Sequence, residues 1–194
     1  MLLTAKARRI LDAAVLTAAG AWAGIGIEAL TARSQPPQAR TPDVFFAGTP
    51  PRVVSAMLRL AEVRPEDVVY DLGSGDGRIV IRAAQEYGAR GVGVELEPPL
   101  IEIARHLARE AGVADRVTFI QGDFFTADIS EATVVMLFLS SAVNSRLESK
   151  LKAELRPGTR VISHQFPIGT WAPDTVIRPE PGGTDLFLWT IRPR

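Results

Sequence analysis

The stretch "VVYDLGSGDGRIVI", residues 68–81, decides the fold of this chain. Val68 to Leu72 predicts a strand, and the apolar spacing from Ile79 to Tyr87 predicts a helix that ends at Gly88. Between them lies a glycine-rich turn, Gly73 to Gly77. In parallel sheets, a turn of this kind at the carboxyl end of the first strand holds the polar backbone of a nucleotide-containing ligand. The stretch therefore predicts an α/β fold with a ligand site at that end.

Strands and helices alternate along the rest of the chain. Further helices are expected over residues 50–63, 97–111 and 143–155. Further strands are expected over residues 91–96, 116–121, 132–139, 159–164 and 185–191. This order predicts a doubly wound, mostly parallel sheet with helices on both faces. Because no crossover helix precedes residues 185–191, we expect this last strand to lie antiparallel at the sheet edge.

The first 43 residues differ in composition from the rest. Lys6, Arg8 and Arg9 precede an uncharged, mostly apolar run over residues 13–27. We interpret residues 1–30 as a hydrophobic membrane anchor, with membrane contact through residues 10–30, although a cleaved export signal fits the same pattern. Residues 31–43 have the polar, proline-containing composition of a linker. The folded domain is expected over residues 44–194.

Composition excludes several classes of function. Lysine and arginine total 22, as do aspartate and glutamate, so the net charge of zero disfavours binding to nucleic acid. The absence of cysteine excludes disulfides, a cysteine nucleophile and thiolate metal sites. The two histidines, His106 and His164, lie far apart in the sequence, which argues against a protein-bound metal.

The charges of the glycine-rich turn indicate which ligand it holds. Arg78 stands where the dinucleotide-binding fingerprint has glycine or alanine. Asp71 and Asp76 would repel a pyrophosphate, whereas they would attract a cation. S-adenosylmethionine carries a sulfonium and an ammonium group, and Asp71 is placed to receive the ammonium. The glycines allow its methionine and ribose to approach the backbone closely.

Acidic residues end two further strands. Glu95 is placed to chelate the ribose hydroxyls, and Asp123 to accept from the adenine amino group, with Phe124 near enough to stack on the base. Helix caps and turn aspartates would give the same residues individually, but three acids at successive strand ends favour the cofactor. The candidate cofactor-binding residues at these positions are Asp71, Gly73, Ser74, Gly75, Asp76, Gly77, Glu95, Leu96, Asp123 and Phe124.

Longer segments carry a resemblance to a known family. They are "TPPRVVSAML", "VVYDLGSGDGRIVI", "GVGVELEP", "QGDFF", "DISEATVVMLFL", "KLKAELRPGTRVISH" and "WAP", and they lie between Thr49 and Pro173. Here the chain resembles class I, seven-stranded methyltransferases. More narrowly, it is similar to the small protein-lysine methyltransferases that include archaeal broad-specificity enzymes and mitochondrial enzymes acting on the adenine nucleotide translocase and the ATP-synthase c-subunit. The resemblance implies a Rossmann-like sheet of seven strands and S-adenosylmethionine as cofactor.

The chain departs from this family at two places. An aromatic-Val-Pro-Thr-Pro element typical of the family corresponds here to residues 46–50, where Phe46, Thr49 and Pro50 match and the Val and first Pro are lost. The resemblance adds Phe46 and Thr49 to the candidate cofactor-binding residues. An acidic residue commonly follows the Ser-His pair, and here Gln165 stands in its place. Both places are expected to frame the channel for the target side chain.

Substrate-side candidates follow the fourth and fifth strands. Ser140 and Asn144 come after the fourth strand, although the serine fits a helix cap equally well. His164 ends the fifth strand, where it orients substrate, relays a proton or forms a structural hydrogen bond. Trp171 is expected to line an apolar channel. The other aromatic candidates for this channel are Phe45, Phe46, Phe124 and Phe138.

These observations favour methyl transfer to protein lysine by in-line displacement, in a dry channel that lowers the pKa of the target amine. A small-molecule or RNA methyltransferase and a non-catalytic S-adenosylmethionine-binding module remain alternatives. Because the cofactor is cytosolic, we expect the membrane-tethered domain to face the cytoplasm. We expect a monomer, and the resemblance to enzymes that modify membrane proteins implies a membrane-embedded protein as target.

Overall fold

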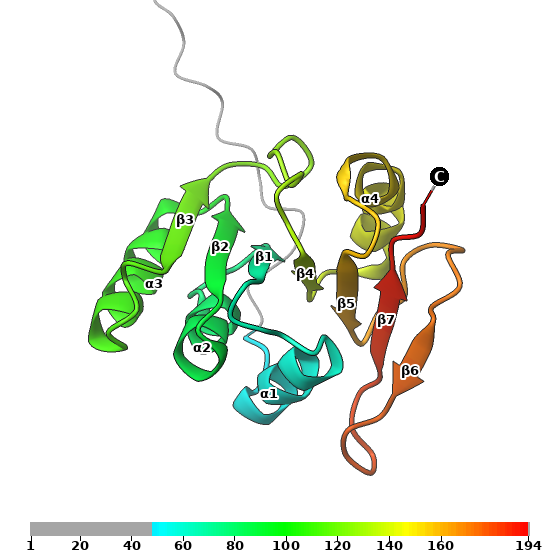
Figure 1. Cartoon of the computed structure of the whole chain (residues 1–194), viewed down its shortest axis with the longest axis horizontal. Coiled ribbons are helices and arrows are strands. Elements are labelled where there is room, and N and C mark those ends of the chain that lie inside the picture. The colour runs from blue at the N-terminus through cyan, green and yellow to red at the C-terminus, as the bar shows by residue number, and fades with distance from the viewer. Residues whose placement is uncertain (1–47, 194) are drawn as a thin grey trace, which may run out of the picture. The chain divides into compact units, whose positions relative to one another are not determined.

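The computed structural model describes residues 48–193, which form four helices and seven strands (Figure 1). The helices are α1 (Pro51–Leu60), α2 (Arg78–Tyr87), α3 (Pro98–Glu110) and α4 (Ser141–Glu154). The strands are β1 (Val68–Leu72), β2 (Arg90–Glu95), β3 (Val117–Gln121), β4 (Val134–Leu137), β5 (Arg160–His164), β6 (Thr175–Ile177) and β7 (Leu186–Thr190). The sequence placed each of the four helices and every strand except β6.

The seven strands form one sheet in the order β3-β2-β1-β4-β5-β7-β6. β1 to β5 pair in parallel, and β7 pairs antiparallel with both β5 and β6. The expected antiparallel orientation of the last strand is therefore confirmed, but its expected place at the sheet edge is wrong. β6 takes the edge, and the sequence pattern missed it because it has three largely exposed residues without an apolar alternation.

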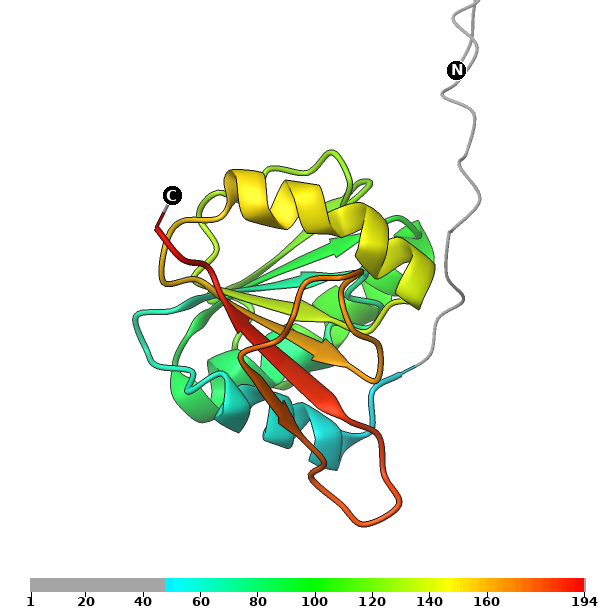
Figure 2. The same ribbon diagram turned by 90° about the vertical axis from the view of Figure 1, so that its right-hand side faces the viewer.

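Helices cover both faces of the sheet, with α1, α2 and α3 on one face and α4 on the other (Figure 2). Under α4, Leu147 and Leu151 pack against Leu137 of β4. Under α1, Met57 lies in a buried cluster with Met136 of the same strand, β4. Alternate residues of β4 thus face opposite layers, as the period of a strand requires. The doubly wound arrangement predicted from the sequence is confirmed.

Proline and glycine set the ends of the helices. Pro51 and Pro98 stand at the first helical positions of α1 and α3, where a missing N–H costs nothing. Gly88 closes α2 in the left-handed conformation, with φ of 70°. On α3, Ile101, Ala104 and Ala108 are buried, whereas Leu100 and Leu107 are half-buried.

The proposed anchor (1–30), the linker (31–43) and the phenylalanines at 45 and 46 lie outside the described residues. None of the helices that the structure describes is long and apolar enough to cross a membrane.

Candidate active site

The glycine-rich turn joins β1 to α2 at the carboxyl edge of the sheet. The N–H groups of Gly73 and Ser74 donate to the carbonyl oxygen of Val94 in β2, at 2.9 and 3.1 Å. Gly77 has φ of 75°, and a Cβ on it would lie 2.5 Å from the ring of Phe119. Glycine is therefore required at position 77. The hydrogen bonds to Val94 hold the start of the turn against β2, while Gly73 itself is exposed.

Glu95 fixes the shape of this turn from the end of β2. Its Oε2 accepts from Gly75 N at 2.8 Å, and its Oε1 accepts from Leu96 N at 2.7 Å and Glu97 N at 3.0 Å. The carboxylate therefore joins the turn to the segment that begins α3. Sequence reasoning assigned Glu95 to the cofactor ribose and missed this second task. Carboxylate oxygens have four lone-pair sites, so three N–H bonds leave room for a hydroxyl donor.

Asp71 lies in β1 beside this turn and is 3% exposed. Burial raises the pKa of Asp71 to about 8, and the nearby Glu95 and Asp76 carboxylates add to the rise. Ser74 Oγ is also buried, without a hydrogen-bond partner among the described residues. A ligand that carries positive charge and polar groups would favour the ionised Asp71 and satisfy Ser74. The residues present therefore fit the cationic cofactor expected from the sequence.

Arg78 ties the turn to the segment before α1. Its Nε and Nη2 donate to Asp76 at 2.9 and 2.6 Å, and its Nη1 donates to the carbonyl oxygen of Thr49 at 3.0 Å. The expected Asp76–Arg78 ion pair is confirmed. A Cβ on Gly48 would clash with the Arg78 guanidinium, so the guanidinium would have to shift if Gly48 carried a side chain. The backbone of Thr49 thereby lies beside the glycine-rich turn, and contact of Thr49 with the cofactor stays a prediction.

The loop after β3 completes this edge. Phe124 lies 3.9 Å from the position of a Cβ on Gly73, so its ring adjoins the glycine-rich turn. Asp123 shapes the loop, because its Oδ1 accepts from Phe125 N at 2.9 Å. The structure therefore brings together the strand-end acids, the turn and Phe124. Whether Asp123 also meets an adenine stays a prediction.

A separate cavity of about 370 Å³ opens at the carboxyl ends of β4 and β5. Phe138 and His164 form part of its wall, with ring centroids 4.1 Å apart. His164 Nε2 lies 2.6 Å from Thr184 Oγ1, and burial lowers the pKa of this histidine, so its imidazole is neutral at pH 7. Gly48 also lines the cavity and links it to Arg78 at the glycine-rich turn.

The residues of this cavity that sequence reasoning missed include Arg52, Glu180 and Thr184. Arg52 belongs to α1, whereas Glu180 and Thr184 belong to the connection between β6 and β7. No local motif marks any of them. For Glu180 and Thr184 the reason is the unrecognised strand β6, which returns their connection to the end of β5.

Ser140 and Asn144 have structural partners. Ser140 is the N-cap of α4 and its Oγ accepts from Val143 N at 3.4 Å, so the helix-cap alternative is confirmed. Asn144 is fully buried, and its Nδ2 donates to Ser163 Oγ at 3.1 Å and to the carbonyl oxygen of Phe166 at 3.0 Å. It braces the loop after β5, and its amide group is not open to the cavity.

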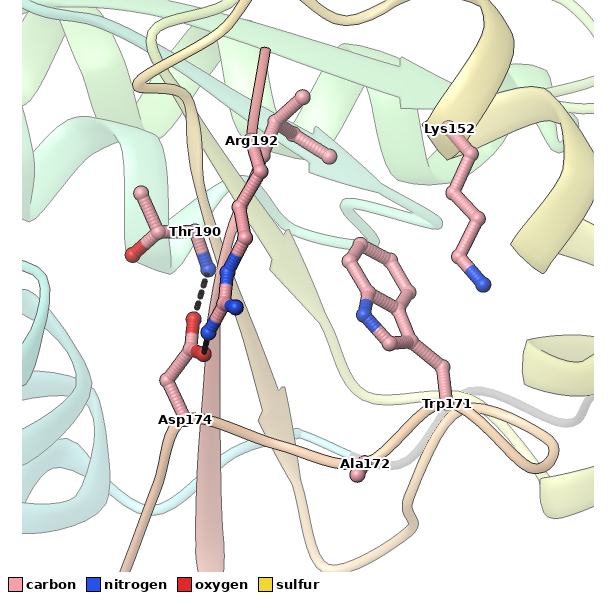
Figure 3. Close-up of a pocket in the computed structure, with 7 residues that line it drawn as sticks. Lys152, Trp171, Ala172, Asp174, Thr190 and Arg192 are labelled. Carbon is pink, nitrogen blue, oxygen red and sulfur yellow. Dashed lines mark hydrogen bonds and ion pairs between the residues drawn. The ribbon is translucent and has the colours of Figure 1, made fainter. Parts of the chain in front are cut away.

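The structure does not bring Trp171 to this edge. Its ring packs 5.7 Å from that of Trp189, and Lys152 Nζ lies 4.7 Å above it (Figure 3). Trp171 lines another pocket with Thr190 and Arg192, next to the start of β5. That pocket lies at the amino edge of the parallel strands, opposite His164. The expected channel residue is therefore part of a different surface, because residues 168–174 turn back along α4.

Comparisons with known proteins agree with this geometry. The family model described as the ANTKMT methyltransferase domain matches residues 71–175. A protein-lysine N-methyltransferase of Saccharolobus islandicus (strain REY15A) is 46% identical over 153 residues, 77% of this chain and 95% of the relative. The adenine nucleotide translocase lysine N-methyltransferase of Mus musculus is 42% identical over 135 residues, 69% of this chain and 58% of that protein.

Among solved structures, an RNA methyltransferase from Salinibacter ruber in complex with S-adenosyl-L-homocysteine is 55% identical, with a TM-score of 0.74. The match covers 76% of this chain and 95% of that one. S-adenosylhomocysteine is what remains of S-adenosylmethionine after methyl transfer, so the bound product of this neighbour agrees with S-adenosylmethionine as the cofactor. The family match spans more than half of the chain. The chain belongs to the ANTKMT methyltransferase family and is an S-adenosylmethionine-dependent methyltransferase.

Proposed function

We propose that this methyltransferase N-methylates lysine side chains of protein substrates. The observation that carries the proposal is the cavity at the ends of β4 and β5, which shares Gly48 with the cofactor edge and is walled by Phe138 and a neutral His164. The relatives named as protein-lysine methyltransferases support the same substrate class.

The two sites divide the work. When bound, S-adenosylmethionine would supply a sulfonium methyl group for in-line attack by an uncharged amine, with S-adenosylhomocysteine as the leaving group and the positive charge passing to the methylated nitrogen. Asp71 would hold the ammonium of the cofactor, Glu95 its ribose hydroxyls, and the Gly73–Gly77 backbone would lie against it. The protein's main contribution is to hold the target amine in line with the methyl group and to exclude water.

The cavity wall suits an amine that must lose its proton. In water a lysine side chain has a pKa of about 10.4, and an apolar surrounding lowers that value. Phe138 supplies such a surface. His164 stays neutral because burial lowers its pKa, so it adds no positive charge against the incoming lysine.

RNA methylation is the second candidate. It is favoured by the description of the Salinibacter ruber neighbour as an RNA methyltransferase, at 55% identity. The equal numbers of basic and acidic residues count against it, because binding to a phosphate backbone normally draws on a clear excess of lysine and arginine.

One experiment decides between these substrates. The purified enzyme is incubated with methyl-labelled cofactor and a cell extract, and the label is followed through protease and ribonuclease digestion. We expect protease-sensitive label that mass spectrometry places on lysine. Label that ribonuclease releases, or label on another amino acid, would overturn the lysine proposal. The Asp71→Asn variant is the control for enzyme-dependent labelling.

We also propose that residues 1–30 anchor the enzyme to a membrane, with residues 31–43 as linker and a monomeric, cytoplasm-facing domain over 44–194. The uncharged run over residues 13–27 supports an anchor, and the cytosolic cofactor supports this orientation. A membrane-embedded protein would then be within reach. In inverted membrane vesicles, added protease should digest the domain; a domain protected there would contradict the orientation.

A further inference from the structure

An ion pair stands at the cavity that contains His164. Arg52 Nε, from the first turn of α1, lies 2.7 Å from Glu180 Oε2, in the connection between β6 and β7. Both side chains line the cavity. Glu180 carries the only carboxylate among the described residues that line it. A cation that enters this cavity therefore has one anionic partner there, and Arg52 already occupies it.

The position of Glu180 is fixed by its backbone. Gly183 N donates to the carbonyl oxygen of Glu180 at 3.0 Å, and Gly182 has φ of 72°. Proline followed by a glycine of positive φ is the sequence of a type II turn, so Glu180 stands at the first position of a well-defined turn. At the base of the same connection, Arg178 pairs with Asp185 at 2.7 and 2.9 Å. These contacts fix the backbone that carries the Glu180 side chain.

The two members of the pair differ in exposure. The side chain of Arg52 is 72% exposed, whereas that of Glu180 is 40% exposed. Arg52 can therefore move into water at little cost, since exposed ion pairs contribute little to stability. Glu180 would remain beside the cavity, where its carboxylate faces no competing cation other than Arg52 among the lining residues described.

We propose that Glu180 captures the protonated target lysine at the cavity, and that Arg52 is the resident counter-ion that this lysine displaces. The proposal rests on lysine as the substrate of the enzyme. It separates two tasks: Glu180 binds the charged amine on arrival, and the surface of Phe138 favours its uncharged form. Glu180 is then a determinant of specificity for a cationic side chain.

The first test measures methylation of cytochrome c, a lysine-rich protein, by the full chain and by Glu180→Gln. The variant should raise KM for cytochrome c about five-fold, with kcat and the Kd for S-adenosylmethionine unchanged. High salt should raise the wild-type KM towards that of the variant. The matched control is Glu131→Gln, which removes the carboxylate of the exposed Arg90–Glu131 pair at the opposite edge of the sheet and should leave KM unchanged.

The second test separates substrate capture from bracing. Arg52→Gln should lower KM, because it removes the competitor for Glu180. Arg52→Glu combined with Glu180→Arg rebuilds the ion pair with reversed charges. Its KM should be as high as that of Glu180→Gln, because position 180 then carries no carboxylate. An unchanged KM in Glu180→Gln, or a wild-type KM in the charge swap, would overturn the inference. Failure of the proposed function is recognised separately: the wild type would then place label on residues other than lysine, whatever the KM values of these variants.

Discussion

The cofactor edge and the cavity proposed to receive the substrate lie on neighbouring strands but are built in different ways. The cofactor edge comes from one contiguous turn, Gly73–Gly77, and from acids that end adjacent strands. The cavity is assembled from the start of α1, the ends of β4 and β5, and the connection that β6 returns. A local motif therefore defines the first site, whereas tertiary structure alone creates the second.

Burial has opposite electrostatic results at these two sites. It raises the pKa of Asp71 to about 8 and lowers the pKa of His164, because in each case it disfavours the charged form. At the cofactor edge this leaves an acid that a cationic ligand can ionise. In the cavity it leaves a neutral base that does not oppose a cationic side chain. The comparison predicts that substitutions at the cofactor edge change cofactor affinity, whereas substitutions in the cavity change substrate kinetics.

The largest expected effect is at Asp71. Asp71→Asn should weaken S-adenosylmethionine binding by about 100-fold or more, measured by calorimetry, because the ammonium loses its buried partner. The same variant should be more stable than the wild type at pH 8 without cofactor. Between pH 4 and pH 8 the folded wild type holds one proton more at Asp71 than the unfolded chain, so its free energy of unfolding falls as pH rises.

Thermal unfolding at two pH values checks this second effect. The difference in Tm between Asp71→Asn and wild type should favour the variant at pH 8 and vanish near pH 4. An equal difference at both pH values would show that Asp71 does not carry the raised pKa, and the electrostatic contrast between the two edges would break down.

The affinity of the wild type for its cofactor should depend on pH for the same reason. Below the pKa of Asp71, about 8, binding must release a proton, so affinity falls by up to tenfold per pH unit. Near pH 8 the amino group of the cofactor begins to lose its own charge, which should place the maximum there. Calorimetry in two buffers of different ionisation enthalpy measures the released proton. A Kd that is constant from pH 6 to pH 8 would contradict this coupling.

Arg78 links the cofactor edge to the segment beside the cavity, because it donates both to Asp76 and to the carbonyl oxygen of Thr49. Arg78→Lys keeps the charge but loses the planar fork that reaches both partners. Cofactor Kd and substrate KM should therefore both rise, each by about tenfold. The control is Arg82→Lys, one turn further along α2, where the side chain bonds Pro51 O and Ser55 Oγ. A change in only one parameter for Arg78→Lys would show that the edges act independently.

How far the sequence predicts the molecule follows the same division. Strand β1 was placed at its observed bounds, and Asp71, Glu95 and the turn came together as expected, because a contiguous pattern encodes them. Trp171 was misplaced, since nothing local shows that its segment turns back towards the start of β5. Glu180 was missed for a related reason. Its role depends on the return of the chain through β6, whose three exposed residues carry no periodic signal.

A smaller effect is expected at Thr184, the partner of His164. Thr184→Val keeps the shape but removes the hydroxyl that lies 2.6 Å from His164 Nε2. Without this hydrogen bond the His164 ring is held less firmly. The variant should therefore lower kcat/KM about three-fold to five-fold, while the cofactor Kd stays the same. Thr184→Ser should restore activity. If the cofactor Kd changes instead, the cavity and the cofactor edge are not separable in this region.

The smallest effect on catalysis is expected at Trp171, which sequence reasoning placed in the channel and the structure places at the opposite edge. Trp171→Leu should lower the free energy of unfolding by about 2 kcal/mol, because the ring loses its contact with Trp189. The hydrogen bond that the indole Nε1–H of Trp189 donates to the backbone carbonyl oxygen of residue 171 remains available in the variant.

Both KM for cytochrome c and the cofactor Kd of Trp171→Leu should match the wild type when measured below its unfolding temperature. Phe138→Leu is the matched aromatic control, because the Phe138 ring lines the cavity and packs against the His164 ring with a centroid distance of 4.1 Å. That variant should change KM with little effect on cofactor binding. If Trp171→Leu raises KM as Phe138→Leu does, the substrate must also contact the amino edge of the sheet. The cavity at the carboxyl ends of β4 and β5 would then be only part of the substrate site.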